Sequence, residues 1–338
     1  MSNEAPRAVI FGCAGPSLDA FERDFFAAAN PLGFILFRRN CISPDQVCDL
    51  VASLRDCVGR SDAPVMIDQE GGRVSRLRPP HWRLYPAPAR LASLPDPLAE
   101  TAVGLCARLI GDDLALLGIT VDCLPVLDLP TAAADPAIGD RAYGNDAERV
   151  VRLARAACGG LLDSAVLPVV KHIPGHGRAV VDSHDACPVV ETSRIELART
   201  DFAPFRALAA MPWAMTAHIV YSAIDPTAPA TLSRAVIAEV IRTEIGFDGV
   251  LISDDLSMHA LDGGLGERAR RALAAGCDLA LHCNGSPAEM EEVGAEARMI
   301  SPCTWKRLAR GEAMRRPVEN GFDREEAEAQ LEALLAGR

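Results

Sequence analysis

The chain has 338 residues, 49% of them hydrophobic, and a formal net charge of −12 at pH 7. This content is sufficient for one large core, and the acidic balance argues against nucleic acid or an anionic membrane as a partner. The eleven cysteines form no Cys-x-x-Cys pair, the first residues have no signal-peptide core, and no apolar run reaches membrane-spanning length, so we expect a cytoplasmic protein with free thiols.

Short apolar runs that are typical of buried strands alternate with longer amphipathic runs that are typical of helices. Eight strands are predicted, at residues 7–12, 33–37, 64–69, 119–127, 167–172, 214–219, 249–254 and 278–283. Helices are predicted at residues 18–29, 44–58, 98–117, 146–163, 194–210, 234–245, 267–275 and 287–299. Eight strand–helix units predict a single-domain α/β chain over residues 1–338, closed into a (β/α)8 TIM-type barrel; an open doubly wound sheet is the alternative.

Two predicted connections are longer than the others. Residues 76–96 are rich in proline and arginine, and residues 127–145 contain Pro130, Pro136 and Gly139. In barrels, long connections that follow strands commonly build the rim of the active site. The tail at residues 324–336 has the pattern of an acidic amphipathic helix, which we expect to pack on the barrel.

Polar and ionisable residues stand at the carboxyl ends of most of the predicted strands. They are Asp68 to Arg73 at the end of the third strand, Asp128 directly after the fourth, Lys171 and His172 at the end of the fifth, His218 at the end of the sixth, and Ser253 to Asp255 at the end of the seventh. In a (β/α)8 barrel the carboxyl ends of all strands meet on one face, and catalysis occurs there. For His172 or His218 taken alone, a hydrogen-bonded core histidine is an equally good interpretation.

The richest of these clusters spans residues 167–184, Leu-Pro-Val-Val-Lys-His-Ile-Pro-Gly-His-Gly-Arg-Ala-Val-Val-Asp-Ser-His. Pro174, Gly175 and Gly177 exclude a helix, so the polar residues lie on a loop that follows a buried strand. Three of the chain's seven histidines and an Asp-x-His pair lie there. A solvated surface loop seldom concentrates imidazole groups in this way, and the stretch therefore indicates a functional site.

These motifs together resemble family 3 of the glycoside hydrolases, and most closely the single-domain β-N-acetylhexosaminidases of bacterial cell-wall recycling. The resemblance rests on Lys-His-Ile-Pro-Gly-His-Gly at 171–177, Asp-Ser-His at 182–184 and Ser-Asp-Asp-Leu-Ser-Met at 253–258. It extends to Gly-Phe-Ile-Leu-Phe at 33–37, Ile-Asp-Gln-Glu-Gly-Gly-Arg-Val at 67–74, Ile-Gly-Asp-Arg-Ala-Tyr-Gly at 138–144 and Ala-Gly-Cys-Asp-Leu at 275–279. Each motif alone is a weak signal, but together they cover most of the chain in the same order.

The resemblance implies that Asp254 is a nucleophile that forms a covalent glycosyl-enzyme, which water releases with retention. From the sequence alone, Asp255 is an alternative. Most retaining glycosidases use a second carboxylic acid as acid/base, whereas the resemblance implies His184 oriented by Asp182. Imidazole titrates near neutrality, so it can protonate the leaving oxygen and then deprotonate water. The plainer interpretation of Asp182 and His184 is an Asx-type loop turn.

The resemblance assigns sugar binding to Asp68, Arg76, Arg141, Lys171 and His172. Asp68, Lys171 and His172 would hold the hydroxyls of a terminal N-acetylglucosamine through charge-assisted hydrogen bonds. Arg141 would grip the N-acetyl carbonyl or a hydroxyl, and Arg76 would reach the neighbouring sugar or its carboxylate. Surface salt bridges are the alternative for both arginines. No metal and no cofactor are expected.

The chain departs from the family's usual pattern at three places, none of which carries a proposed chemical group. Ile173 stands where phenylalanine is frequent, Asp-Cys-Leu-Pro at 122–125 replaces Asn-Phe-Ala-Pro, and Ala-Tyr at 142–143 replaces Ser-Phe. The chain also lacks the extra sandwich domain of many family 3 β-glucosidases, which favours the compact hexosaminidase type.

The leading hypothesis is a monomeric, retaining exo-β-N-acetylglucosaminidase acting on a small carbohydrate, N-acetylglucosamine linked to 1,6-anhydro-N-acetylmuramic acid in cytoplasmic muropeptides. A β-glucosidase or a glycoside phosphorylase could use the same residues. Two further hypotheses are a non-catalytic sugar-binding protein and a metal-dependent barrel hydrolase. The metal ligands would come from His172, His176, His184, His218 and Asp254.

Overall fold

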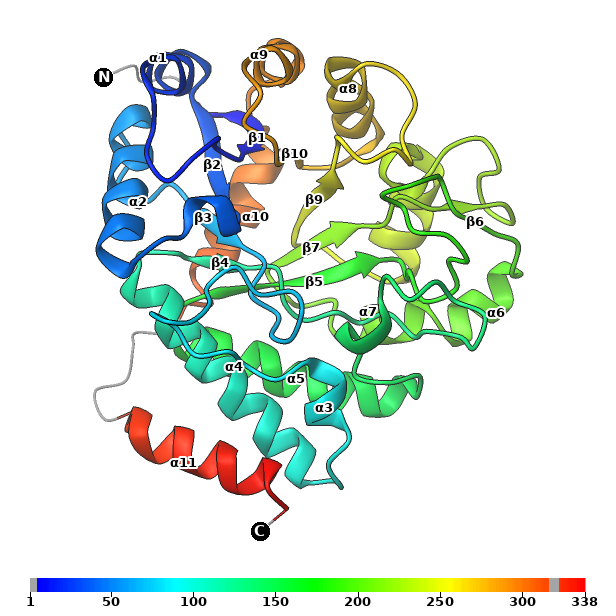
Figure 1. The fold of residues 1–338 in the computed structure, drawn as a ribbon. Coiled ribbons are helices and arrows are strands. Elements are labelled where there is room, and N and C mark those ends of the chain that lie inside the picture. The colour runs from blue at the N-terminus through cyan, green and yellow to red at the C-terminus, as the bar shows by residue number, and fades with distance from the viewer. Residues whose placement is uncertain (1–4, 316–321, 338) are drawn as a thin grey trace.

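A computed structural model describes residues 5–315 and 322–337. Its eight main strands are all parallel and close into a barrel in the order β1-β10-β9-β7-β5-β4-β3-β2 (Figure 1). They are β1 (Arg7–Phe11), β2 (Pro31–Leu36), β3 (Val65–Ile67), β4 (Val121–Asp122), β5 (Leu167–Ile173), β7 (Trp213–Thr216), β9 (Val250–Asp255) and β10 (Leu279–His282). Closure confirms the (β/α)8 barrel and excludes the open sheet.

The strand predicted over residues 119–127 is wrong in length, because β4 spans only Val121–Asp122. Pro125 has no N–H with which to continue the ladder. Its carbonyl instead accepts from Lys171 N (3.1 Å), and Val126 forms an isolated bridge to Lys171. The chain after β4 therefore stays beside β5 without forming a regular strand.

Six predicted helices are confirmed to within a few residues. They are α1 (Ala20–Ala29), α2 (Pro44–Val58), α4 (Leu98–Leu116), α5 (Ala147–Asp163), α8 (Leu265–Ala275) and α9 (Pro287–Glu296). Asp19, Ser43 and Asp146 accept backbone N–H bonds at the starts of α1, α2 and α5, as capping side chains do. These helices surround the barrel and cover its outer apolar face (Figure 1).

The predicted helix at 194–210 is wrong, since the structure has two short helices, α6 (Arg194–Arg199) and α7 (Phe202–Ala207). Pro204 cannot donate the backbone bond that would join them. The segment predicted at 234–245 is a π-helix over Val236–Glu244. Two α-helices and two strands were not predicted: α3 (Pro88–Ala92), α10 (Pro302–Glu312), and the two-stranded sheet of β6 (Val189–Val190) and β8 (Val220–Tyr221).

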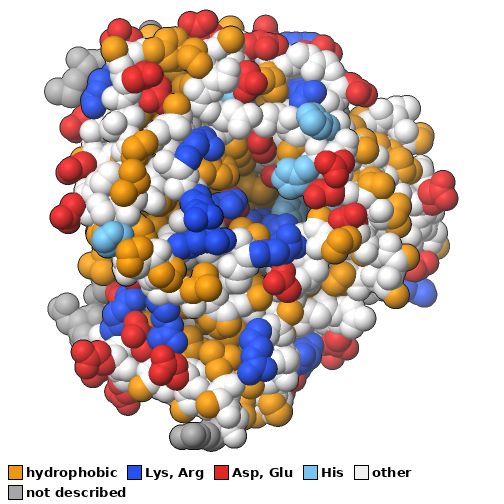
Figure 2. Space-filling view, in the orientation of Figure 1, with side chains coloured by type: hydrophobic (Ala, Val, Ile, Leu, Met, Phe, Trp, Pro, Cys, Tyr) orange, Lys and Arg blue, Asp and Glu red, His pale blue; other side chains and the backbone are white. Residues whose placement is uncertain are grey.

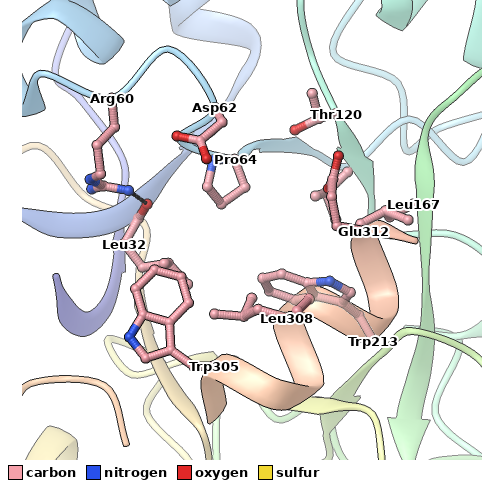
Figure 3. Close-up of a pocket in the computed structure, with 12 residues that line it drawn as sticks. Leu32, Arg60, Asp62, Pro64, Thr120, Leu167, Trp213, Trp305, Leu308 and Glu312 are labelled. Atoms are coloured by element: carbon pink, nitrogen blue, oxygen red, sulfur yellow. Dashed lines mark hydrogen bonds between the residues drawn. The ribbon is translucent and has the colours of Figure 1, made fainter. Parts of the chain in front are cut away.

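Helix α10 lies at the amino-terminal end of the barrel. Trp305, Leu308 and Glu312 line a cavity of about 220 Å³ there, which Figure 3 shows in close-up. The opposite wall comes from residues at or just before the starts of strands, namely Leu32, Pro64, Thr120, Leu167 and Trp213. Because strand starts contribute to stability rather than chemistry in this fold, we regard this end as structural.

The last helix, α11 (Arg324–Leu335), packs along α4 (Figure 1). Ala327 and Leu331 are buried in this contact. Arg324 anchors the start of α11 through ion pairs of 2.7 Å to both Asp112 and Asp113 of α4. Among the described helices, none combines the length and apolar character needed to cross a membrane.

Candidate active site

A cavity of about 310 Å³ opens at the carboxyl ends of the strands. Figure 2 shows a hollow in the molecular surface that is bordered by Lys, Arg and His side chains, although the whole chain is acidic. All eight site residues predicted from the sequence line the cavity, namely Asp68, Arg76, Arg141, Lys171, His172, Asp182, His184 and Asp254. Segments far apart in the sequence meet here because parallel strands place all their carboxyl ends on one face.

Lys171 is the centre of a buried ion network. Its Nζ lies 2.9 Å from Asp68 Oδ1 and 2.6 Å from Glu70 Oε1, and its side chain is only 2% exposed. Arg76 binds the other oxygen of Asp68 at 3.1 Å, and Arg141 binds both oxygens of Glu70 at 2.8 Å. The two arginines therefore belong to a partly buried network and are not isolated surface ion pairs.

The electrostatics of this network keep both acids ionised. Burial opposes ionisation, but Lys171 and Arg76 outweigh it and hold the pKa of Asp68 well below its usual range. Burial likewise opposes ionisation of Glu70, while Arg141 and Lys171 lower its pKa to about 2. The same acids raise the pKa of Lys171 against the effect of burial. Asp68 thus presents a fixed anion, and Lys171 a fixed cation, to the cavity.

Glu70 does not line the cavity and was not among the predicted site residues. Its side chain is fully buried behind Lys171 and Arg141 and orients both. It belongs to the Ile-Asp-Gln-Glu motif at 67–70, so the sequence contained the signal. What the sequence lacked was the direction of the side chain.

Asp128 is a second positioning acid that the sequence analysis did not assign to the site. It is buried, and its Oδ2 lies 2.7 Å from His172 Nδ1. Its carboxylate also accepts from the backbone N–H groups of His172 and, at 2.6 Å, of His176. One acid therefore fixes both the start of the loop that follows β5 and the orientation of the His172 ring. Its position directly after the fourth strand was the available signal.

Asp254 and Asp255 end β9 but have different surroundings. Asp255 Oδ1 accepts from Cys283 N and Ser257 N, and its Oδ2 accepts from Ser257 Oγ. Among the described residues, the Asp254 carboxylate accepts one hydrogen bond, from Asp255 N to its Oδ1 at 2.8 Å. Burial opposes ionisation of Asp254, but the nearby His172 and His218 rings lower its pKa. Asp254 is therefore an ionised carboxylate that keeps acceptor capacity toward the cavity.

The loop after β5 carries Asp182 and His184. Asp182 Oδ1 accepts from His184 N at 2.9 Å and lies 2.7 Å from His184 Nδ1. The backbone bond is the Asx-type turn that was the plainer interpretation, and the ring contact is the expected pairing, so the two coexist. The His184 side chain is 68% exposed at the cavity mouth. Its Nδ1 is engaged by Asp182, which leaves Nε2 to face a ligand.

The root of this loop is fixed. A Cβ on Gly177 would collide with the backbone of Leu129, so only glycine fits where the loop crosses the chain after β4. Arg178 then donates to Asp201 Oδ2 at 2.7 Å and to Thr200 Oγ1 at 3.1 Å. The loop is therefore anchored at residues 177–178 and returns to the cavity mouth at residues 182–184.

The histidines considered for a metal site have other partners. His218 Nδ1 lies 2.7 Å from Thr231 Oγ1 and its Nε2 lies 3.0 Å from the carbonyl oxygen of Asp255. His172 Nδ1 is bound by Asp128 and His184 Nδ1 by Asp182. Within residues 5–315 and 322–337, no three His, Cys, Asp or Glu side chains are grouped closely enough to hold a metal ion.

Asp122, which ends β4 beneath the ion network, is buried with little compensation. Its Oδ1 accepts from Gln69 N at 2.9 Å, but its Oδ2 has no hydrogen-bond partner among the described residues. Burial raises the pKa of this carboxyl well above its usual range. We expect Asp122→Asn to raise the free energy of unfolding at pH 7 by about 1 kcal/mol, because the amide keeps the Gln69 bond without the cost of a buried acid.

The sign of the pH dependence follows from the raised pKa. The unfolded chain releases the Asp122 proton near pH 4 while the folded chain keeps it, so the wild type loses stability as the pH rises above that value. The advantage of Asp122→Asn should therefore shrink between pH 7 and pH 4 in urea unfolding. An advantage that is independent of pH would show that Asp122 is ionised in the fold.

Comparison with known proteins assigns the chain to a family. The family model for the glycosyl hydrolase family 3 N terminal domain matches residues 22–299. A beta-hexosaminidase of Alkalilimnicola ehrlichii is 41% identical over 283 residues, which cover 82% of this chain and 80% of that protein. One from Pseudomonas aeruginosa is 37% identical over 309 residues, which cover 90% and 91%. Native NagZ from Neisseria gonorrhoeae has a crystal structure that matches with a TM-score of 0.84 at 33% identity, covering 99% and 98%. The chain therefore belongs to family 3 of the glycosyl hydrolases and is a β-N-acetylhexosaminidase.

Proposed function

We propose that this β-N-acetylhexosaminidase is a retaining exo-β-N-acetylglucosaminidase that works through a covalent glycosyl-aspartate. We further propose that residues 1–338 form one catalytic domain, which acts as a cytoplasmic monomer on N-acetylglucosamine linked to 1,6-anhydro-N-acetylmuramic acid in muropeptides. The observation that carries the mechanism is the contrast between two adjacent acids. Asp255 is occupied by its hydrogen bonds to Ser257 and Cys283, whereas Asp254 is ionised and directed to the same cavity as the Asp182–His184 pair.

In this proposal Asp254 attacks the anomeric carbon while His184 protonates the oxygen that leaves. The proton comes from Nε2, because Nδ1 is bound by Asp182. Asp182 stays ionised, since its bonds to His184 lower the pKa of the carboxyl despite partial burial, and it stabilises the imidazolium. His184 then removes a proton from the water that releases the sugar. A histidine in this role adds no second anion beside Asp254.

The buried ion network would hold the terminal sugar. Asp68 accepts from a hydroxyl, while Lys171 and His172 donate to others through charge-assisted bonds. Arg141 reaches the N-acetyl carbonyl or a hydroxyl, and Arg76 reaches toward the neighbouring sugar. A cavity of about 310 Å³ suits the binding and removal of one terminal sugar. The basic side chains at its mouth suit an aglycone that carries a carboxylate (Figure 2).

His184→Ala tests the acid/base assignment. We expect kcat/KM for a disaccharide substrate to fall about 10²- to 10⁴-fold, the range that general acid–base catalysis contributes. A dinitrophenyl N-acetylglucosaminide should lose much less, because its leaving group departs without a proton. Steady-state kinetics on both substrates give the answer. Equal losses on the two would contradict the role of His184.

Assays of the wild-type enzyme on several substrates distinguish the proposed activity from the alternative ones. Hydrolysis of an aryl N-acetylglucosaminide well above that of the aryl glucoside, unchanged by phosphate, is the expected outcome. A sugar 1-phosphate product would instead indicate a phosphorylase, and sugar binding without turnover would indicate a non-catalytic protein. Loss of activity on chelation, together with bound metal, would support the metal-dependent hydrolase.

A further inference from the structure

Ser183 lies between the two members of the proposed acid/base pair. It is buried, with 4% of the residue exposed, whereas most of the His184 side chain next to it is in solvent. Its carbonyl oxygen accepts from Ala260 N at 3.2 Å, and its Oγ lies 3.2 Å from His176 Nε2. Asp182 and His184 bond to each other, and among the described residues neither side chain bonds to the barrel, so Ser183 joins the pair to the rest of the molecule.

The two partners of Ser183 come from different segments of the chain, one before it on the same loop and one after β9. His176 lies on the part of the same loop that Asp128 fixes through the His176 backbone N–H. Ala260 follows β9, five residues after Asp255, in the segment next to the proposed nucleophile. Ser183 therefore connects the acid/base pair to His176 through its side chain and to the segment that follows β9 through its carbonyl oxygen.

His176 is built to make this one contact. It is 5% exposed, its ring stands edge-on to the His172 ring with centroids 5.5 Å apart, and its Nδ1 has no hydrogen-bond partner among the described residues. Burial, and next the neighbouring His172, lower the pKa of His176 to about 4. The ring is thus neutral at working pH, and within the described part of the chain its one hydrogen bond is the contact with Ser183. A buried imidazole that stays neutral is poorly suited to transfer a proton to the substrate.

We propose that Ser183 and His176 are positioning residues that hold the Asp182–His184 pair at a working distance from Asp254. This inference rests on the proposed function. The loop leaves its anchor after Ala179, whose carbonyl oxygen accepts from Asp135 N at 2.8 Å, and is tied down again at Ser183. Without the Ser183 side-chain bond the Asp182–His184 contact would survive, because both groups are on the same turn. The backbone bond from Ala260 N to the Ser183 carbonyl oxygen would remain, among the described residues, as the one attachment of residue 183, which leaves the pair free to shift relative to the reacting sugar. Small displacements of a catalytic group are costly.

Ser183→Ala tests the inference. We expect kcat/KM for a disaccharide to fall about tenfold or more, as positional errors of a catalytic group do. The dinitrophenyl substrate should change little, since it needs no acid, and this split separates positioning from general damage to the fold. Ser183→Thr keeps the hydroxyl and should restore most of the activity. Ser164→Ala is the matched control, because Ser164 is also buried and donates to Arg108 O at 2.9 Å, but lies directly after the last residue of α5, outside the cavity.

His176→Phe removes the partner while filling the space of the ring. It should likewise lower kcat/KM for the disaccharide and change that for the dinitrophenyl substrate little. The double variant with Ser183→Ala should lose no more kcat/KM than the more damaged single variant, because both substitutions remove the same hydrogen bond. Additive losses, or equal losses on both substrates, would overturn the inference. His184→Ala is measured beside them. If it alone loses disaccharide turnover, this inference fails and the proposed function stands; if it keeps full turnover, the proposed function fails.

Discussion

Replacing Asp254 by alanine is expected to reduce turnover of an aryl N-acetylglucosaminide by about 10⁴-fold or more, since loss of a nucleophile removes the covalent route altogether. The fold should tolerate the change, because the one hydrogen bond that the Asp254 carboxylate accepts from the described residues comes from the N–H of its own neighbour Asp255. Its removal also takes away an anion that lies near His172 and His218. Circular dichroism and thermal melting should therefore show a folded protein with little or no glycosidase activity.

Two further measurements make this result specific. Azide can enter the space that alanine leaves and attack the anomeric carbon, so the Asp254→Ala variant with azide should form the α-glycosyl azide. Asp255→Asn is the matched control, because asparagine can still accept from Cys283 N and Ser257 N. It should retain far more activity than Asp254→Ala. A larger loss in the Asp255 variant, or rescue by azide there, would move the nucleophile to Asp255.

The choice between these neighbours illustrates what the sequence could and could not predict about the site. The sequence does not distinguish two neighbouring aspartates at the end of one strand, and only the resemblance to family 3 favoured Asp254 as the nucleophile. The structure distinguishes them because Cys283 and Ser257 donate hydrogen bonds to the carboxylate of Asp255 and not to that of Asp254. Likewise, Asp68 and Lys171 were predicted as sugar ligands, but their mutual ion pair required the positions of β3 and β5 in the closed barrel.

The fold was predictable to the extent that it depends on local pattern. All eight strands of the barrel were found because buried parallel strands are short, continuous apolar runs bounded by polar residues. Errors arose where one residue changed backbone bonding, as at Pro125 after β4 and at Pro204 between α6 and α7. Two-residue strands such as β6 and β8 have no period that could be detected, and their pairing depends on tertiary contacts.

Replacing Lys171 by methionine is expected to lower the free energy of unfolding by about 3–5 kcal/mol, the usual cost of leaving a buried charge without its partner. Lys171 is almost fully buried and contacts Asp68 at 2.9 Å and Glu70 at 2.6 Å. Methionine has a similar length and fills the space, so the loss reports charge and not a cavity. Asp68 would still pair with Arg76, and Glu70 with Arg141, so the variant removes one of the three cations in the network.

The pH dependence of this loss distinguishes an ion network from simple packing. Asp68 and Glu70 have folded pKa values below their ordinary 3.8 and 4.5, so their stabilising contribution is present above about pH 5 and is lost as the pH falls toward the folded values, about 2 for Glu70. Lys171 has a raised pKa, so its contribution is complete below its ordinary value of 10.5 and is lost only above it. The difference in urea-unfolding free energy between wild type and Lys171→Met should therefore be constant from about pH 5 to pH 9 and narrow toward pH 3. A difference that does not change with pH would mean that Lys171 stabilises the barrel by its hydrocarbon chain, and the fixed charges proposed to hold the sugar would then need another source.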